Sequence, residues 1–204
     1  MRARPNRHAL FYWGLLRYPC TWVGILRLLL LALAVAVYLA QPGGGWLFVC
    51  LIGAASLLDI ADGYLARKLG QTSRFGAAFD FLIDQTTHTV FWLAAGGFAA
   101  IPLMVLEWYT GVAILRSVLR ADEHWKEILL LRGGALVRAY FARQQRNALA
   151  ALGVVSHFAL PAALYLGWSG WPVWIWVPGV ALYAWVTLLM WVALRRAGRV
   201  NDGE

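Results

Sequence analysis

The side chains that could do chemistry are concentrated in four aspartates between long apolar runs. Asp59 and Asp62 precede a short basic segment, and Asp80 and Asp84 follow it. At about 100° per residue, the first pair shares one helical face, and the second pair lies on one stripe of the next helix. Clustered carboxylates in a membrane repel one another, so a cation must lie among them. A divalent metal ion is the simplest candidate.

Composition places these aspartates in a membrane protein. Of the 204 residues, 61% are hydrophobic and 14% are charged, and the mean hydropathy is +0.62. Soluble domains usually carry about 25% charged residues. We therefore expect an all-α, polytopic membrane protein that forms a single domain over 1–204. The net charge of +8 does not indicate a nucleic-acid partner, because the basic residues lie between apolar runs, where they orient helices and attract lipid headgroups.

Six transmembrane helices are predicted, at about 22–40, 46–69, 73–96, 103–119, 135–166 and 172–195. Residues 1–18 mix arginine with leucine and aromatic residues, which predicts an amphipathic helix in the membrane interface. The connections 41–45, 97–102 and 167–172 contain no Lys or Arg, so they are expected to face outward. Both termini and both aspartate pairs then lie on the cytoplasmic side, in a bacterial inner membrane or the endoplasmic reticulum.

The spacing around the aspartates is a motif in its own right. The pattern D-x2-D-G-x2-A-R-x8-G-x3-D-x3-D is occupied by Asp59, Asp62, Gly63, Ala66, Arg67, Gly76, Asp80 and Asp84. It resembles the signature of the CDP-alcohol phosphotransferases, integral membrane enzymes of phospholipid synthesis. The resemblance implies transfer of a phosphatidyl group from CDP-diacylglycerol to a small alcohol, with release of CMP. It also implies a homodimer.

In the family that the motif resembles, the aspartates have distinct roles. Asp59, Asp62 and Asp80 would be metal ligands for the diphosphate of the CDP-lipid, with two Mg²⁺ or Mn²⁺ ions expected. Asp84 would take the proton from the acceptor alcohol while it also contacts a metal ion. A purely structural set of ion pairs with nearby arginines would leave four carboxylates facing two basic side chains.

The remaining motif residues would contact the CDP-lipid together with Asp62. Gly63 and Gly76 would let the nucleotide approach the backbone, and Ala66 would keep the same helix face shallow. Arg67 and Arg74 could pair with phosphate. The small residues could instead serve helix packing, and Arg67 could be an interfacial charge that sets topology.

The acceptor alcohol is expected to enter beside Asp84. Candidate contacts are His88, Glu107, Arg116, Arg120, Arg138, Arg143 and Arg146. A phosphorylated acceptor such as glycerol-3-phosphate needs clustered basic side chains, whereas a neutral polyol such as myo-inositol needs several donors and acceptors. The arginines could also be ordinary charges at cytoplasmic helix ends, and the histidines and Glu107 could be polar contacts within the bundle.

Local similarity favours inositol. The stretches LLDIADGYLARKLGQTSRFGAAFDFLIDQTT, HWKEI and GGALVRAYFARQQR resemble the eukaryotic-type phosphatidylinositol synthases. Gln85 departs from the basic residue of that group, ARQQRNAL is slightly longer, and residues 19–27 match its P-x2-L-T-x2-R element only in part. The alternative resemblance is to phosphatidylglycerophosphate synthase, for which Arg116, Arg143 and Arg146 could form a phosphate clamp.

Two other classes also place carboxylates in membrane helices. Intramembrane prenyltransferases share D-x2-D but carry a second aspartate-rich motif further along, whereas no paired aspartates follow Asp84 here and Asp122 and Asp202 are single aspartates. A cation transporter would account for the carboxylates but not for the Gly-x2-Ala-Arg residues that accompany them.

Overall fold

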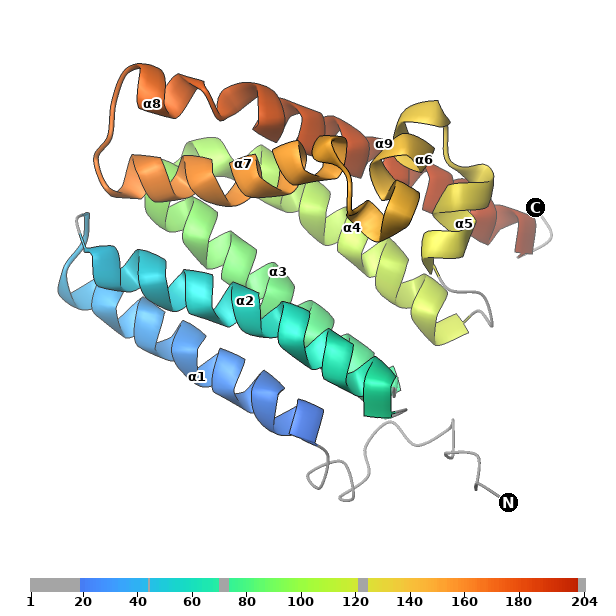
Figure 1. The fold of residues 1–204 in the computed structure, drawn as a ribbon, viewed down its shortest axis with the longest axis horizontal. Helices are drawn as coiled ribbons and strands as arrows, with labels where there is room; N and C mark the ends of the chain where they lie inside the picture. The colour runs from blue at the N-terminus through green and yellow to red at the C-terminus, as the bar shows by residue number, and fades with distance from the viewer. Residues whose placement is uncertain (1–18, 44, 70–73, 121–124, 202–204) are drawn as a thin grey trace.

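The computed structural model describes residues 19–43, 45–69, 74–120 and 125–201, with side chains except at 19–20, 62–67, 69, 74–75, 118–120 and 198–201. These residues form helices and connections, with no strand among them (Figure 1). The predicted interfacial helix at 1–18 lies outside the described residues. The first helices are α1 (Pro19–Ala40), α2 (Trp46–Leu69), α3 (Arg74–Gly96), η2 (Gly97–Ala100) and α4 (Ile101–Arg120).

The second half of the chain is more broken than the sequence suggested. Its helices are α5 (Trp125–Arg132), α6 (Ala135–Phe141), η3 (Ala142–Gln145), α7 (Ala148–Tyr165), α8 (Trp171–Trp174) and α9 (Val177–Asn201). The prediction of one helix over 135–166 is wrong, because α6 and η3 precede α7 as separate elements. The connection expected near 120–134 contains the short helix α5.

Within the described part of the chain, four stretches are long and apolar enough to cross a membrane: Thr21–Ala40, Gly76–Ser117, Ala148–Tyr165 and Trp171–Ala197. The second of these contains α3 and α4, which pack against each other as a helical hairpin. Helix α2 contributes a shorter apolar stretch, Trp46–Ala61, within the residues whose side chains are described. The chain is therefore a helical membrane protein, and the count of six spans stays a prediction.

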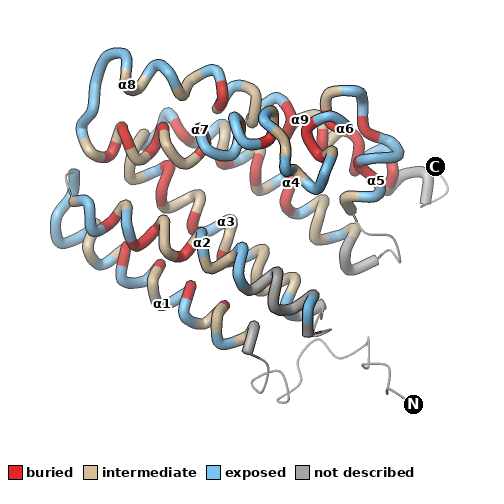
Figure 2. Tube along the Cα trace, in the orientation of Figure 1, coloured by how far each residue is buried: buried red, intermediate tan, exposed pale blue. Residues whose placement is uncertain are grey.

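The helices form two groups joined by α3. Helices α1 and α2 pack together on one side, and α4, α7 and α9 pack together on the other (Figure 1). Helix α3 contacts both groups. Buried segments lie on the facing sides of these helices (Figure 2), including an aromatic cluster of Phe48, Phe91 and Tyr165 from α2, α3 and α7. This arrangement places α3 at the centre of the bundle.

The break before α7 is a left-handed turn. Arg143, Gln144 and Gln145 have φ values of 55°, 56° and 64°. This conformation costs a non-glycine residue about 1–2 kcal/mol, so neighbouring contacts must hold the turn in place. It ends the helical segment before Ala148 and explains why the predicted long helix is interrupted.

Asn147 supplies those contacts. Its side-chain nitrogen donates to the carbonyls of Ala139, Tyr140 and Ala142 at 3.3, 3.0 and 2.9 Å. Its side-chain oxygen accepts from the backbone N–H of Ala150 at 2.9 Å, which caps α7. One side chain therefore fastens the end of α6 to the start of α7.

We predict that Asn147→Ala lowers the free energy of unfolding by about 2 kcal/mol, since both the cap and the bonds to the carbonyls are lost. Asn147→Ser keeps a capping oxygen and should lose about half as much. Thermal unfolding of the purified protein in detergent measures both effects, with the exposed Gln144→Ala as the control. Equal loss for the alanine and serine variants would contradict the capping contribution, and no loss in the serine variant would contradict a role beyond capping.

Candidate functional site

The carboxylate site begins on the buried stripe of α2. Phe48, Ile52 and Ala55 are buried and follow one another at intervals of three or four residues. Asp59 is the next residue on this stripe, so the same helix face that packs the core also carries the carboxylate. The next position at this spacing is Asp62, whose side chain lies outside the described residues.

Helix α3 brings the second pair to the same place. Asp80 and Asp84 are one turn apart, and carboxylate oxygens of Asp59, Asp80 and Asp84 lie within 4.8 Å of one another. Their side chains are 35–42% exposed. The structure therefore brings these three aspartates together from two helices. Among the other motif positions, Gly76 is exposed, and the side-chain surroundings of Gly63, Ala66, Arg67 and Arg74 lie outside the description.

A buried arginine that the sequence analysis did not select joins this cluster. Arg27 of α1 is 1% exposed, and its guanidinium donates to the carboxylates of Asp80 and Asp84. It also lies 2.9 Å from a carboxylate oxygen of Asp59, and its Nε donates to the carbonyl of Ala55 at 3.2 Å. One guanidinium thus links α1 to both aspartate-bearing helices.

The charges of this cluster fit a divalent cation. Among the described side chains that these ion pairs join, three carboxylates face one guanidinium, so acidic groups outnumber basic ones. Oxygen ligands around Mg²⁺ at about 2.1 Å are separated by about 3–4 Å, which is compatible with oxygens that lie within 4.8 Å. Asp59, Asp80 and Asp84 would hold such an ion, while phosphate oxygens of a substrate could complete its ligand shell.

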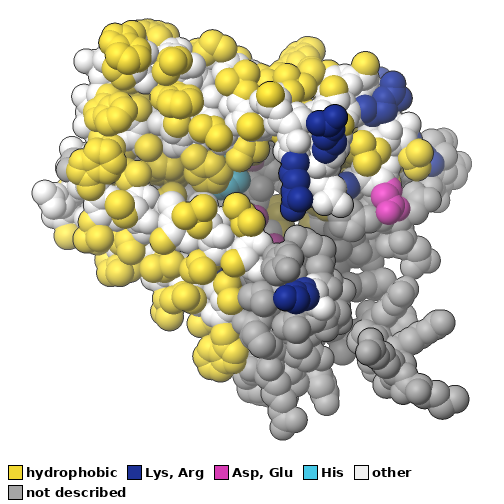
Figure 3. Space-filling view, in the orientation of Figure 1, with side chains coloured by type: hydrophobic (Ala, Val, Ile, Leu, Met, Phe, Trp, Pro, Cys, Tyr) yellow, Lys and Arg dark blue, Asp and Glu magenta, His cyan; other side chains and the backbone are white. Residues whose placement is uncertain are grey.

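A cavity of about 840 Å³ extends from the carboxylate site into the bundle. Asp59 and Asp84 line one part of it, and His88, Glu107 and His157 line another. Figure 3 shows a hollow between the two helix groups, with acidic and histidine side chains visible inside it. The cavity is large enough for a small-molecule substrate.

The predicted acceptor residues divide into two sets. His88 and Glu107 line the cavity. The exposed arginines Arg116, Arg138, Arg143 and Arg146 are not among its lining residues, and Arg120 has no described side chain. The structure therefore brings the histidine and the glutamate to the carboxylate site and leaves the candidate arginines outside the cavity.

Other polar residues of the cavity were not selected from the sequence. Lys126 and Gln145 both line it, and the Lys126 ammonium donates to the Gln145 side chain at 3.5 Å. Burial raises the pKa of Tyr140 in α6 to about 12, so its hydroxyl stays protonated at neutral pH. Lys126 and Gln145 lie within the stretches HWKEI and ARQQR, so the sequence points to them only through the family resemblance.

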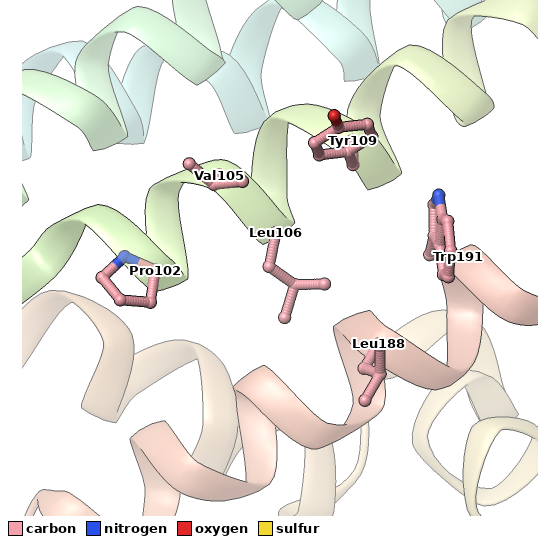
Figure 4. Close-up of a pocket in the computed structure, with 6 residues that line it drawn as sticks. All are labelled: Pro102, Val105, Leu106, Tyr109, Leu188 and Trp191. Carbon is pink, nitrogen blue, oxygen red and sulfur yellow. The ribbon is translucent and has the colours of Figure 1, made fainter.

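A second pocket, of about 420 Å³, lies between α4 and α9 (Figure 4). It is lined by Pro102, Val105, Leu106, Tyr109, Leu188 and Trp191. Apart from the Tyr109 hydroxyl and the Trp191 indole, its side chains carry no polar group, so the pocket offers no catalytic chemistry comparable to that of the carboxylate site.

Comparison with known proteins identifies the class. The family model for CDP-alcohol phosphatidyltransferase matches residues 20–194, which include α1, the motif helices and most of α9. No curated protein and no solved structure matches the chain. The chain belongs to the CDP-alcohol phosphatidyltransferase family. It is therefore a phospholipid-synthesis transferase that uses a CDP-alcohol, and this membership argues against the prenyltransferase and transporter alternatives.

We predict that Arg27→Met destabilises the metal-free protein by about 1–3 kcal/mol, a range reduced from the usual cost of breaking a buried ion pair because the aspartates are partly exposed. Mg²⁺ or Mn²⁺ should restore much of the loss, since the carboxylates then regain a counter-ion. Thermal unfolding with chelator and with added metal measures this. Arg27→Lys, which keeps the charge, is the control. A metal response no larger than that of the wild type would contradict the prediction.

Proposed function

We propose that the protein transfers a phosphatidyl group from CDP-diacylglycerol to an uncharged small alcohol, with myo-inositol as the best candidate. The observation that carries this proposal is the continuity of one cavity from the aspartate cluster to the His88–Glu107 pair. The nucleotide-lipid diphosphate would lie at the aspartates, and the alcohol would lie between Asp84 and His88.

Each group at the aspartates has a separate task. Asp59, Asp62, Asp80 and Asp84 hold the divalent ions, which supply charge neutralisation for the diphosphate when they are bound. Asp84 accepts the proton of the alcohol as its oxygen attacks the lipid-side phosphorus. The bond from that phosphorus to the CMP oxygen breaks, and CMP leaves with the bonding electron pair.

Other motif residues position the donor. We assign the CDP-lipid contacts to Gly63, Ala66, Arg67 and Gly76, whose spacing matches the motif, and to Arg74, which lies between the last two of these positions. Small residues allow a nucleotide to approach a helix closely, and a guanidinium can bind phosphate with two parallel hydrogen bonds.

The cavity lining supports an uncharged acceptor. Near the His88–Glu107 pair it offers hydroxyl, amide, imidazole and carboxylate groups, from residues such as Gln85, Thr110 and Tyr140. Its one lining cation among the described side chains is Lys126. A polyol can use such mixed donors and acceptors, whereas glycerol-3-phosphate would favour a basic cluster. This contrast favours inositol over the phosphatidylglycerophosphate alternative.

The arrangement in the membrane is also a proposal. The start of α1 and the end of α9 lie at the same end of the bundle (Figure 1), and the connections at 41–43 and 166–170 contain no Lys or Arg. Basic side chains appear at the opposite end from these connections (Figure 3). This distribution supports cytoplasmic termini and a cytoplasmic site. A homodimer is proposed from family resemblance alone.

We predict that Asp84→Asn abolishes CMP release while CDP-diacylglycerol binding persists. The amide cannot accept the alcohol proton, but it keeps the size of the side chain. A radiolabelled CDP-lipid binding assay and a CMP-release assay on the same preparation separate the two effects. Glu127→Gln, an exposed change in α5, is the matched control. Near-normal turnover in Asp84→Asn would refute the base assignment.

The acceptor is tested by CMP release from CDP-diacylglycerol with inositol, inositol phosphate, glycerol-3-phosphate, serine or choline. We expect inositol to give the fastest release and chelation to stop it, since the diphosphate then lacks neutralising cations. Lipid product analysis checks that the phosphatidyl group reaches the alcohol. Preference for glycerol-3-phosphate would overturn the acceptor proposal, and release that persists with chelator would overturn the metal proposal.

A further inference from the structure

A buried cluster of two imidazoles and one carboxylate lies deeper in the cavity than the aspartates. His88 of α3 lies one turn beyond Asp84. Its Nδ1 is 3.4 Å from Oε2 of Glu107 in α4, and Nε2 of His157 in α7 is 3.3 Å from Oε1 of the same carboxylate. Glu107 is 3% exposed. A carboxylate at this depth is costly unless donors face both of its oxygens.

His157 is held more firmly than His88. It is 1% exposed and its ring stacks on Tyr183 of α9, with ring centres 4.2 Å apart and planes at 25°. The Trp92 indole N–H donates to the His157 ring, with 3.3 Å to each ring nitrogen. Elements α3, α7 and α9 therefore fix the orientation of this imidazole.

The partners of His157 determine where its proton lies. An ionised carboxylate can only accept, so it can pair with this imidazole when the proton is on Nε2, which lies 3.3 Å from Glu107. An indole N–H can only donate, and that of Trp92 lies 3.3 Å from both ring nitrogens, so with the proton on Nε2 the acceptor is Nδ1. By the same reasoning, the Nδ1 of His88 that faces Glu107 carries a proton.

We propose that His157 is a positioning residue that acts through Glu107 on His88. By facing one oxygen of Glu107, it leaves the other oxygen directed at Nδ1 of His88. The His88 ring then presents its Nε2 edge to the cavity beside Asp84, where it can contact the alcohol. This role rests on the proposed function, because it assigns His88 to the acceptor.

A bound metal is the competing explanation. Two imidazoles and a carboxylate are a common zinc ligand set, and their ligand atoms lie within 4.8 Å of one another. A zinc ion on Nε2 of His157 would put the proton on Nδ1, so neither of the ring nitrogens that lie 3.3 Å from the Trp92 donor could accept from it. The indole contact therefore favours the hydrogen-bonded arrangement.

The kinetic test compares His157→Leu with His157→Gln. The leucine variant lacks a donor to Glu107 and should lower kcat/KM for the acceptor by about 10- to 100-fold through misplacement of His88. KM for CDP-diacylglycerol should stay unchanged, and the glutamine variant should recover most of the loss. Ser156→Ala, which alters the neighbouring buried side chain, is the control. A loss shared equally by both substrates would indicate a purely structural role and overturn the proposal.

A double-mutant cycle tests whether His157 acts through His88. His157→Leu should cause no further loss of kcat/KM for the acceptor in a His88→Gln background, because the positioned ring is already absent. Additive losses from the two substitutions would overturn the proposal. Gel filtration in detergent verifies that each variant keeps its fold.

A spectroscopic test is independent of activity. The chain has four histidines, so ¹⁵N-labelled histidine gives few resonances, which His88→Gln and His157→Gln assign. The wild type should show His88 protonated at Nδ1, and His157→Leu should lose this preference. Persistence of the signal in His157→Leu would overturn the proposal. Zinc recovered at one ion per chain, and lost with Glu107→Gln, would overturn it in favour of the metal site. If the wild type released no CMP with any acceptor, the proposed function would be refuted, whereas the ¹⁵N spectra would still test the effect of His157 on His88.

Discussion

The guanidinium of Arg27 among three carboxylates is the interaction on which the rest of the structure depends. Its three aspartate partners come from α2 and α3, whereas Arg27 comes from α1. In a low-dielectric surrounding, like charges at this separation could not remain ionised without a cation. The arginine therefore holds three helices together, yet it neutralises only part of their charge. The same cluster links three helices and offers the ligand set that a divalent cation would need.

The two ends of the cavity differ in the chemical groups that line them. Its carboxylate end suits metal ions and a diphosphate, which need strong negative and positive partners. At the His88–Glu107 end, the two oxygens of Glu107 each face an imidazole nitrogen, and the carboxylate gives this end no attraction for a second anion. A reaction between a charged donor and an uncharged alcohol fits such an arrangement. Asp84 and His88, one turn apart on α3, lie where the two environments meet.

The aspartate helices could be predicted because periodicity and hydropathy are local properties of the sequence. Arg27 could not, since no short-range pattern links it to residues more than 30 positions away. The sequence does place Arg27 on one helix face with Gly24, Leu31 and Ala34. An arginine is unusual on such an apolar face, and this could have indicated a functional role. The break at 143–145 was also hidden. Left-handed φ values are unfavourable for these residues, and the hydrogen bonds of the Asn147 side chain to carbonyls five to eight residues earlier override that preference.

Two glycines explain how the polar groups come within reach of one another. A Cβ at Gly24, one turn before Arg27, would lie 2.9 Å from the Phe79 ring of α3. A Cβ at Gly111 of α4, one turn after Glu107, would lie 2.3 Å from the Phe81 ring, which also belongs to α3. Each glycine lets its helix approach α3 closely beside a charged residue. Helix packing therefore sets the position of Arg27 against the aspartates and of Glu107 against His88, so small residues outside the motif determine the geometry of the site.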